Sequence, residues 1–571
     1  MADRIVIDPV TRIEGHLRIE AQVDGGKVTS AYSSGTMFRG MELILQGKDP
    51  REAWIWAQRI CGVCTTVHAH ASVYAVEDAL GIEIPPNARL IRNLIAGAQH
   101  IQDHVIHFYH LHALDWVDVT GALTADPAKT AALAQSISDW PNSSEAYFAG
   151  VKARVKTLVD SGQLSLMATG YWGHPAYALP PEADLMAVAH YLEALEWQRE
   201  VIKIHSVLGG KNPHLQTYLV GGMAAAVDPN SPNVINWERI NFIGERIKQM
   251  RDFVTKVYVP DVKAVASFYP DWWNLGAGHK NYLAYGGLQD GNRTDQSKFG
   301  FNRGIILNGD LGTLVPLDQT KITEAIAHSY YQYAGGDQAA LHPWSGETSP
   351  KYAGPTPPYD QLTVDGKYSW LKSPRYDGKP MEVGPLARML VAYASGNARV
   401  QKIVGDALTE LKLQPAQLFS TLGRVAARAL ETVYLLDMMD GWLAELTANM
   451  ESGDLRIHEG SKWDPQTWPA EEVQGWGFHE APRGALGHWV RIKDRKIVNY
   501  QAVVPSTWNA GPRDEQGVTG PYEASLEGTP VADPERPLEL LRTIHSFDPC
   551  LACAVHVVDA TGKERVRVEV K

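Results

Sequence analysis

All four cysteines of the chain occur in two C-x-x-C pairs, which lie near opposite ends of its 571 residues. Cys61 and Cys64 form the first pair, and Cys550 and Cys553 form the second. Scattered single cysteines can be buried apolar residues, but two pairs with none left over predict one metal site of four thiolates. Such a site requires a fold in which the two ends of the chain meet.

Three kinds of metal site compete on the cysteine pattern alone. Structural zinc uses paired C-x-x-C ligands, although its two pairs are usually separated by only about 15–20 residues. An iron–sulfur cluster also takes four thiolates, and a catalytic nickel or iron centre uses thiolates that leave positions open. A redox-active disulfide is the weaker alternative because a second pair is present. The spacing of the cysteines supports structural zinc and a redox-active metal equally. The redox-active metal is then favoured by functional side chains that a structural zinc site does not require: Glu14, His68, Arg483 and His556.

Composition excludes some classes of function. The chain is 44% apolar and 21% charged, as in an ordinary soluble globular protein. A net charge of −12 without basic blocks argues against a nucleic-acid partner. No signal peptide, transmembrane run or phosphate-binding glycine motif is visible, which by itself predicts a cytoplasmic protein that binds no nucleotide.

Local patterns predict a mainly helical chain with smaller β hairpins, an α+β fold. Residues 270–380, rich in glycine, proline and aromatics, are expected to form packed loops with short strands. Strands are expected at residues 4–7, 17–23 and 28–32, and as a hairpin at 488–493 and 497–504. Long amphipathic helices are expected at residues 88–119, 181–208, 237–259, 383–411 and 417–450.

Two polar features have both a structural and a functional interpretation. Glu14 stands beside a glycine and a histidine at a strand start, which on its own favours an ordinary exposed loop. The histidines within residues 88–119 spread around the predicted helix, which favours packed, hydrogen-bonded side chains over metal ligands. Asp103 and His104 are the expected exceptions.

Five motifs resemble the large catalytic subunit of nickel–iron hydrogenases, especially its uptake-type members. Both cysteine motifs together are highly specific, and the resemblance spans almost the whole chain. The motifs are Arg12–His16, Arg59–Cys64 followed by His68, Ala481–Gly484, Val503–Asn509 and Asp548–His556. The resemblance implies a single domain, residues 1–556, with a long helix bundle and with N- and C-terminal segments that meet at the metal site.

The resemblance also implies a nickel–iron centre and the side chains around it. Cys61 and Cys550 match terminal nickel ligands, and Cys64 and Cys553 match the thiolates that bridge nickel to iron. Thiolates suit such soft metals. The iron would carry carbon monoxide and cyanide, which lie near Pro482, Arg483 and Leu486, with Ser506 donating to cyanide. His68 is expected to donate to a bridging sulfur.

The reaction implied is the reversible heterolytic cleavage of H2 to protons and electrons, in the direction of uptake in vivo. Cys550 is the expected first base, and the Arg483 guanidinium is the rival candidate. Glu14 matches the gate of the proton exit, a role that needs a carboxylate whose pKa burial has raised. Asp103 and Asp548 match acids that pair with Arg483 and orient it.

Further implications concern a second ion, partners and location. Glu42, His556 and the carbonyl of Ala502 match a magnesium site. Since no cysteine remains for an electron relay, an iron–sulfur small subunit is expected as partner, in a heterodimer or a pair of heterodimers. That subunit would carry the export signal, which places the protein in the periplasm, associated with the membrane through its partners, rather than in the cytoplasm. Nickel-insertion factors and a protease that removes residues 557–571 after His556 are also implied.

Two alternatives belong to other classes. A quinone-reducing respiratory subunit shares the fold, but such relatives have lost the four cysteines that are present here. A non-catalytic scaffold tied together by four-cysteine zinc is the second.

Overall fold

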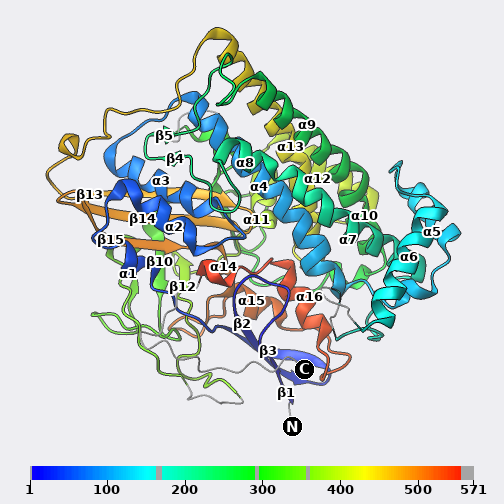
Figure 1. Cartoon of the computed structure of the whole chain (residues 1–571). Helices are drawn as coiled ribbons and strands as arrows, with labels where there is room; N and C mark the ends of the chain where they lie inside the picture. Colours follow the sequence, from blue (N-terminus) through cyan, green and yellow to red (C-terminus); the bar gives the residue numbers. More distant parts are fainter. Residues whose placement is uncertain (1–2, 163–166, 168–169, 290–294, 355–360, 555–571) are drawn as a thin grey trace.

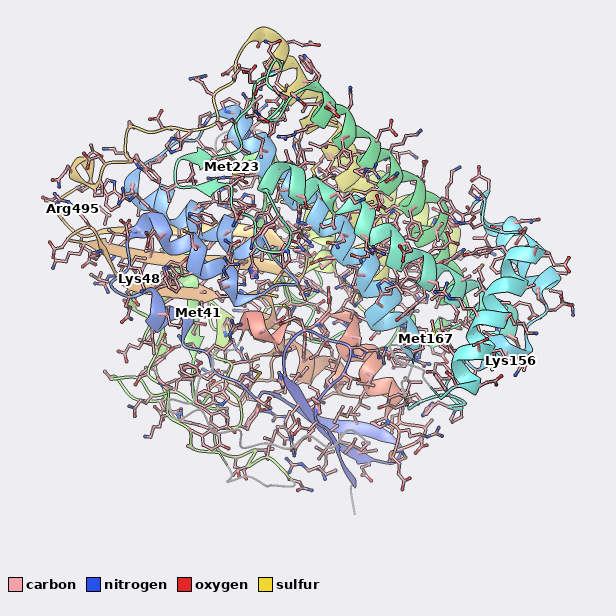
Figure 2. All side chains as sticks on the ribbon, in the orientation of Figure 1. Met41, Lys48, Lys156, Met167, Met223 and Arg495 are labelled. Atoms are coloured by element: carbon pink, nitrogen blue, oxygen red, sulfur yellow. The ribbon has the colours of Figure 1, made fainter. Side chains whose placement is uncertain are left out.

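The computed structural model of the protein describes residues 3–162, 167, 170–289, 295–354 and 361–554. A bundle of long helices forms one side of the molecule, and small antiparallel sheets with long loops form the other (Figure 1). Side chains fill the spaces between these layers throughout (Figure 2). The predicted α+β class, mainly helical with small sheets, is confirmed.

The bundle is built around two long helices that pack on each other, α4 and α13. Their contact faces are apolar and wholly buried, for example at Leu94, Ile101 and Leu435. Gly97 of α4 lies so close to Met439 that an added Cβ would be 2.8 Å from its side chain. The bundle helices are α4 (Pro86–Ile106), α7 (Pro181–Val201), α8 (Lys203–Gly209), α9 (Trp237–Phe253), α10 (Val259–Ser267), α11 (Pro385–Ala394), α12 (Ala398–Leu411) and α13 (Thr421–Ser452).

The predicted long helices are present, but several are interrupted. The segment predicted as 383–411 is two helices, because Gly396 adopts a left-handed φ of 79° and Asn397 caps α12 by accepting from Val400 N. The segment 181–208 breaks at Ile202, and wider π turns follow α4 and α9 at His107–His112 and Val254–Tyr258. Gly210 ends α8 in the left-handed conformation, as the Gly209-Gly210 pair predicts.

Two helices outside those predictions, α5 (Pro127–Ile137) and α6 (Glu145–Asp160), form a hairpin at the edge of the bundle (Figure 1). Their capping signals are present in the sequence. Asp126 precedes Pro127 and accepts from the backbone N–H of Ala128, and Ser144 accepts from Tyr147 N. These caps could have predicted both helices.

Two three-stranded antiparallel sheets carry the N-terminal and the late C-terminal chain. The first has the order β1-β2-β3, with Asp24 and Lys27 pairing across a turn at Gly25-Gly26. The second has the order β13-β14-β15, and it contains the predicted hairpin plus a further strand, β13, that was not predicted in full. The strands are β1 (Asp3–Ile7), β2 (Leu17–Asp24), β3 (Lys27–Gly35), β13 (Val473–Ala481), β14 (Gly484–Lys493) and β15 (Lys496–Val503).

Short elements cover the remaining chain, and those between residues 270 and 380 confirm the expected loops with short strands. The strands are β4 (Tyr218–Leu219), β5 (Gly222–Met223), β6 (Tyr282–Ala284), β7 (Gly287–Gln289), β8 (Phe299–Phe301), β9 (Gly304–Ile306), β10 (Ile322–Ala325), β11 (Ala340–Leu341) and β12 (Ser373–Tyr376). The helices are α1 (Met41–Leu45), α2 (Ala53–Ala57), α3 (Val67–Leu80), α14 (Pro505–Ala510), α15 (Pro521–Leu526), α16 (Leu538–Ser546) and α17 (Leu551–Ala554). Within the described residues, none of the helices is both long and apolar enough to span a membrane.

The two ends of the chain meet, as the cysteine pattern requires. Leu551 N donates to Glu14 O at 2.7 Å, and Glu14 N donates to Pro549 O at 3.3 Å. These bonds make a short parallel bridge between Glu14 and Cys550. Helix α15 also packs on β3, so the N-terminal sheet rests on the C-terminal segment that carries the second cysteine pair (Figure 1).

Candidate metal centre

Three thiols from opposite ends of the chain converge on one point. The Sγ atoms of Cys61 and Cys64 lie 3.5 and 3.6 Å from the Sγ of Cys550, and all three sulfurs are buried. These separations far exceed the ~2.05 Å bond of a disulfide, so none links these three. The side chain of Cys553 lies outside the described residues. Among those described, no other group of histidine, cysteine or acidic side chains is spaced to hold a metal.

Backbone geometry on both sides fixes the thiols. Cys61 is extended after the short helices that follow Pro50, and Cys64 N donates to Cys61 Sγ at 3.3 Å. On the other side, Asp548 adopts a left-handed φ of 58° between α16 and the cysteine motif. Cys550 N donates to the Ser506 hydroxyl of α14 at 3.0 Å, which ties this thiol to the 503–509 motif.

Glu14 does not lie in an ordinary exposed loop. Its Oε2 accepts from Ala552 N at 2.9 Å and lies 3.3 Å from Cys550 Sγ, which donates to it. Burial raises the pKa of Glu14 to about 7, the Cys61 charge adds to the rise, and the contacts with Cys550 and Ala552 oppose it. The carboxyl therefore changes its protonation state near neutral pH directly beside a thiol.

Arg483 is buried between two carboxylates that come from distant elements. Its guanidinium lies 3.0 Å from Asp103 of α4 and 3.0 Å from Asp548. Burial raises the pKa of Asp103 to about 7 against the opposing charge of Arg483, and burial also raises the pKa of Asp548. The arrangement places one fixed cation beside the thiols, because a guanidinium remains charged in proteins.

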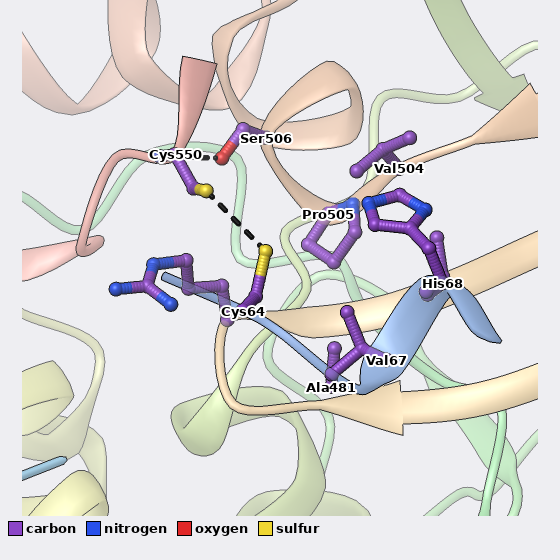
Figure 3. Close-up of a pocket in the computed structure, with 10 residues that line it drawn as sticks. Cys64, Val67, His68, Ala481, Val504, Pro505, Ser506 and Cys550 are labelled. Atoms are coloured by element: carbon purple, nitrogen blue, oxygen red, sulfur yellow. Dashed lines mark hydrogen bonds between the residues drawn. The ribbon is translucent and has the colours of Figure 1, made fainter. Parts of the chain in front are cut away.

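A narrow cavity of about 10 Å³, enough for one water-sized molecule, borders the thiols (Figure 3). Figure 3 shows the thiols of Cys64 and Cys550 facing each other, with Ser506 behind Cys550 and His68 on the far side of Pro505. Leu486 lines this cavity, whereas Pro482 is not among its lining residues and its carbonyl accepts from Arg388. His68 Nδ1 lies 3.1 Å from His488 Nε2. The full lining is Cys64, Val67, His68, Ala481, Arg483, Leu486, Val504, Pro505, Ser506 and Cys550.

Glu42 and Ala502, two of the predicted magnesium ligands, are adjacent, but Ala502 makes the contact through its backbone N–H and not through the predicted carbonyl. Glu42 Oε1 accepts from the backbone N–H of Ala502 at 3.0 Å, and its Oε2 accepts from the Thr348 hydroxyl. Lys372 Nζ lies 3.8 Å from Glu42, between it and Glu324. His556, the third predicted ligand, lies outside the described residues.

The sequence interpretation missed several buried residues around the centre. Gln99 donates both to Asp103 and to the carbonyl of Val63, and its i, i+4 spacing from Asp103 on α4 was a usable signal. No comparable spacing in the sequence indicated that Lys372 lies beside Glu42. Asp115 pairs with Arg12 and, at 2.6 Å, with His545, so one buried carboxylate holds both end segments.

Four of the five histidines of α4 and the following π turn are packed and hydrogen-bonded, as expected, whereas His112 is packed but has no hydrogen bond to a described residue at either ring nitrogen and lies 3.7 Å from Asp115. His100 contacts the carbonyl of Ala96 at 2.8 Å, and His107 contacts that of His545 at 2.6 Å. Of the two exceptions considered, Asp103 belongs to the metal pocket through Arg483. His104 instead makes a buried contact with Glu431 at 2.9 Å.

This donor set fits a soft, redox-active metal. Clustered thiolates select metals such as nickel and iron over magnesium or calcium. The narrow cavity beside the sulfurs leaves one side of the thiols without a protein ligand, and a carboxyl that titrates near pH 7 can exchange a proton with a thiol. A closed structural zinc site requires none of these additional groups.

Comparison with known proteins identifies relatives along the whole chain. A family model described as nickel-dependent hydrogenase matches residues 39–556, and a second, described as HoxL-like, matches residues 4–34. The uptake hydrogenase large subunit of Rhizobium leguminosarum bv. viciae is 52% identical over 583 aligned residues, which cover 100% of this chain and 97% of that protein. The hydrogenase-1 large chain of Escherichia coli K12 is 47% identical with the same coverage.

Solved structures agree with the sequence relatives. The reduced nickel–iron–selenium hydrogenase of Desulfovibrio vulgaris Hildenborough superposes with a TM-score of 0.77 and 36% sequence identity. The match covers 97% of this chain and 100% of that one.

Proposed function

The chain belongs to the nickel-dependent hydrogenase family, and on this premise we propose that Cys61, Cys64, Cys550 and Cys553 hold its nickel–iron centre. The protein is the catalytic large subunit of a nickel–iron hydrogenase, which interconverts H2 with protons and electrons. The observation that carries the site assignment is the convergence of three buried thiols from the two ends of the chain. The zinc-scaffold and quinone-reductase alternatives are not favoured, because the relatives are hydrogenases.

We also propose that the diatomic ligands of the iron, carbon monoxide and cyanide, lie in the cavity beside the thiols. Leu486 and Val504 supply an apolar wall, and the Arg483 guanidinium and the Ser506 hydroxyl supply polar groups at its edge. Carbon monoxide suits an apolar wall, and cyanide suits a hydrogen-bond donor. Because the Ser506 oxygen accepts from Cys550 N, its own proton remains to be donated elsewhere. Pro482 contributes through the backbone that places Arg483.

Proton transfer is assigned to side chains that already touch each other. A nickel–iron centre supplies the Lewis-acid and redox chemistry for splitting H2. The Cys550 thiolate takes the proton and passes it over 3.3 Å to Glu14. Arg483, fixed between Asp103 and Asp548, keeps a positive charge beside the thiols and orients its donors. His68, whose Nδ1 lies 3.1 Å from His488 Nε2, would tune the centre through one of the cysteine sulfurs.

A magnesium site at Glu42, the Ala502 carbonyl and His556 is a second proposal. Its support is a buried carboxylate directly beside Ala502, with the polar groups of Thr348 and Lys372 next to it. Magnesium binding requires the Ala502 carbonyl rather than its N–H to face the ion, and it adds positive charge next to Lys372.

The electrons pass to a small subunit, and we propose that this partner carries the iron–sulfur relay and docks on the face around the first cysteine pair. Large apolar side chains are exposed there on α1, α2 and the cysteine loop, and exposed apolar side chains that lie close together are typical of a protein interface. Helices α1 and α2 pack on each other, and Lys48 covers the Trp56 ring at 4.5 Å. The docking face consists of Leu43, Ile44, Ile55, Trp56 and Val63.

Location and maturation complete the proposal. As an uptake-type large subunit, the chain is exported with its small subunit and acts in the periplasm, associated with the membrane through partners. Nickel-insertion factors load the centre, and a protease then removes residues 557–571. The family match that ends at residue 556 supports this boundary. The heterodimer is the working unit, and two heterodimers can pair.

Metal analysis of the purified heterodimer tests the centre. Beyond the iron of the partner's clusters, one nickel and one iron per large subunit are expected, together with H2-dependent reduction of a dye. One zinc per chain, without nickel and without dye reduction, would contradict the assignment of a nickel–iron centre. Infrared spectroscopy checks the carbon monoxide and cyanide separately, and the mass of the large subunit checks cleavage after His556.

A further inference from the structure

The two-residue turn between β13 and β14 carries Arg483 into the metal pocket, and its sequence is not that of a favoured hairpin turn. Ala481 pairs with Gly484, so Pro482 and Arg483 are the two turn residues. The favoured two-residue turns require a positive φ at their first position, which proline cannot adopt. Local sequence therefore does not fix this turn, and contacts from elsewhere in the fold must hold it.

Helix α11 supports the turn through its backbone. An added Cβ at Gly484 would lie 2.6 Å from Gly384 N, and one at Gly384 would lie 3.2 Å from the carbonyl oxygen of Arg483. Gly384 is the N-cap residue of α11, so the turn rests directly on the start of this helix. Arg388 follows within α11, and its backbone N–H donates to Gly384 O at 3.0 Å. The same helix end therefore offers the turn both a backbone surface and an arginine side chain.

The Arg388 guanidinium bonds two successive carbonyls of the turn. Its Nη1 donates to Ala481 O at 2.6 Å, and its Nη2 donates to Pro482 O at 3.0 Å. These are the two peptide carbonyls directly before Arg483, so their orientation sets the direction in which the Arg483 side chain leaves the backbone. A single rigid group thus defines both peptide planes.

Two carboxylates hold the Arg388 guanidinium in place. Glu431 accepts from Nε at 2.9 Å and from Nη2 at 2.7 Å, and Glu480 accepts from Nη1 at 2.9 Å. All three side chains are wholly buried. A guanidinium has five N–H donors, and these three bonds together with the two to the turn use all of them. Because apolar side chains often fill such a space with equal or greater stability, burial of these charges indicates a role beyond packing.

We propose that Arg388 is a positioning residue of the metal pocket, which clamps the turn at Ala481 and Pro482 and so holds the Arg483 guanidinium at a fixed place beside the thiols. Arg388 is not among the residues that line the cavity at the thiols, so it acts through the turn. The two carboxylates beside Arg483 fix the far end of that side chain, and Arg388 fixes the backbone from which it starts.

The test is a double-substitution cycle in the purified heterodimer with Arg388→Lys and Arg483→Lys. H2-dependent dye reduction is measured per bound nickel, since the inference rests on the proposed function of the metal pocket. Lysine keeps the buried positive charge at position 388 but carries three donors on one nitrogen. It therefore cannot bond both carboxylates and both carbonyls at once.

Arg92→Lys is the matched control, because Arg92 makes the same kinds of contact away from the turn. Arg92 is wholly buried and bonds Glu77 through both terminal nitrogens, at 3.0 and 2.7 Å. It also donates to two carbonyls, those of Leu219 and Gly222, at 2.9 Å each. Arg92→Lys reports what the loss of a buried arginine clamp does to the fold alone.

Arg388→Lys should lower dye reduction per nickel by about tenfold, because displacement of a positioned group by about 1 Å can cost up to about 100-fold in rate. In the Arg483→Lys background it should lower the rate by less than about twofold, because the guanidinium that Arg388 positions is no longer present. A structural role alone would lower the rate by the same factor in both backgrounds. Arg92→Lys should leave dye reduction per nickel unchanged.

Equal factors in the two backgrounds, an unaffected Arg388→Lys variant, or an equal loss in Arg92→Lys would each overturn the inference. Infrared bands of the diatomic ligands decide where the double variant is too slow to measure: Arg388→Lys should shift them, and unshifted bands would overturn the inference. If Arg388→Lys fails to load nickel, Glu480→Gln, which weakens one anchor of the clamp, takes its place with the same criteria. Absence of nickel and dye reduction before any substitution would instead refute the proposed function.

Discussion

Replacement of Gly15 by alanine is expected to separate the Glu14 loop from the C-terminal cysteine motif. Gly15 has a φ of +85°, and an alanine Cβ there would lie 2.3 Å from Ala552 N and 2.8 Å from the Leu551 carbonyl carbon. Left-handed backbone costs an alanine about 1–2 kcal/mol. Forcing a methyl group against backbone atoms that cannot rotate away adds about 1–3 kcal/mol.

This cost is comparable to the interactions that hold the two segments together. The contact at Glu14 consists of four hydrogen bonds, from Leu551 N, Ala552 N and Cys550 Sγ to Glu14 and from Glu14 N to Pro549 O. At about 0.5–1.5 kcal/mol each, they contribute about 2–6 kcal/mol in total. The local contact should therefore open while the helix bundle, whose core lies elsewhere, remains folded.

Nickel content, H2-dependent dye reduction and the melting temperature of the purified heterodimer measure this prediction. Gly15→Ala should lose most of its nickel and activity with only a small shift in melting temperature. Gly26→Ala is the matched control, because Gly26 has a φ of +75° with nothing within 4 Å of the added Cβ. If both variants keep equal nickel content and activity, the proposed role of the close contact is wrong.

Two further predictions concern the proton path and the docking face. Glu14→Gln keeps the acceptor oxygen for Ala552 N but removes the titrating carboxyl. The rate of H2/D2O exchange should therefore fall by about tenfold or more, while nickel and iron content stay unchanged. An unchanged exchange rate would contradict the proposed role of Glu14 in proton transfer. Trp56→Glu places a charge in the docking face and should weaken copurification of the small subunit, since desolvating an unpaired charge at an interface is costly. The same substitution at Trp237, which is exposed at the start of α9 in the helix bundle, should have no such effect.

Much of the fold followed from local patterns. The glycine turn at Asp24, the hairpin of β14 and β15, and the long bundle helices are encoded by periodicity and turn residues close in sequence. The helix interruptions were harder to predict from the sequence, since Ile202 is neither a capping nor a helix-breaking residue and the π turns follow from packing. Helices α5 and α6 have clear capping residues in the sequence, Asp126 and Ser144, which are sufficient to predict them.

The sequence predicted which residues belong to the site, but not how they are arranged in space. Two cysteine pairs without a leftover required the ends of the chain to meet, and motif resemblance supplied the expected metals and roles. Glu14 shows the limit of local reasoning: its neighbours favoured an exposed loop, and only residues 549–552, folded back from the other end, enclose it beside a thiol.

The sequence by itself determined which side chains were available and that four thiolates had to come from both ends. Tertiary structure alone decided their surroundings: which carboxylates enclose Arg483, which amide reaches Glu42, and which carbonyls Arg388 holds. The reason is physical. Reactivity at such a site depends on burial and on charges within a few ångströms, and here those neighbours are supplied by segments hundreds of residues apart.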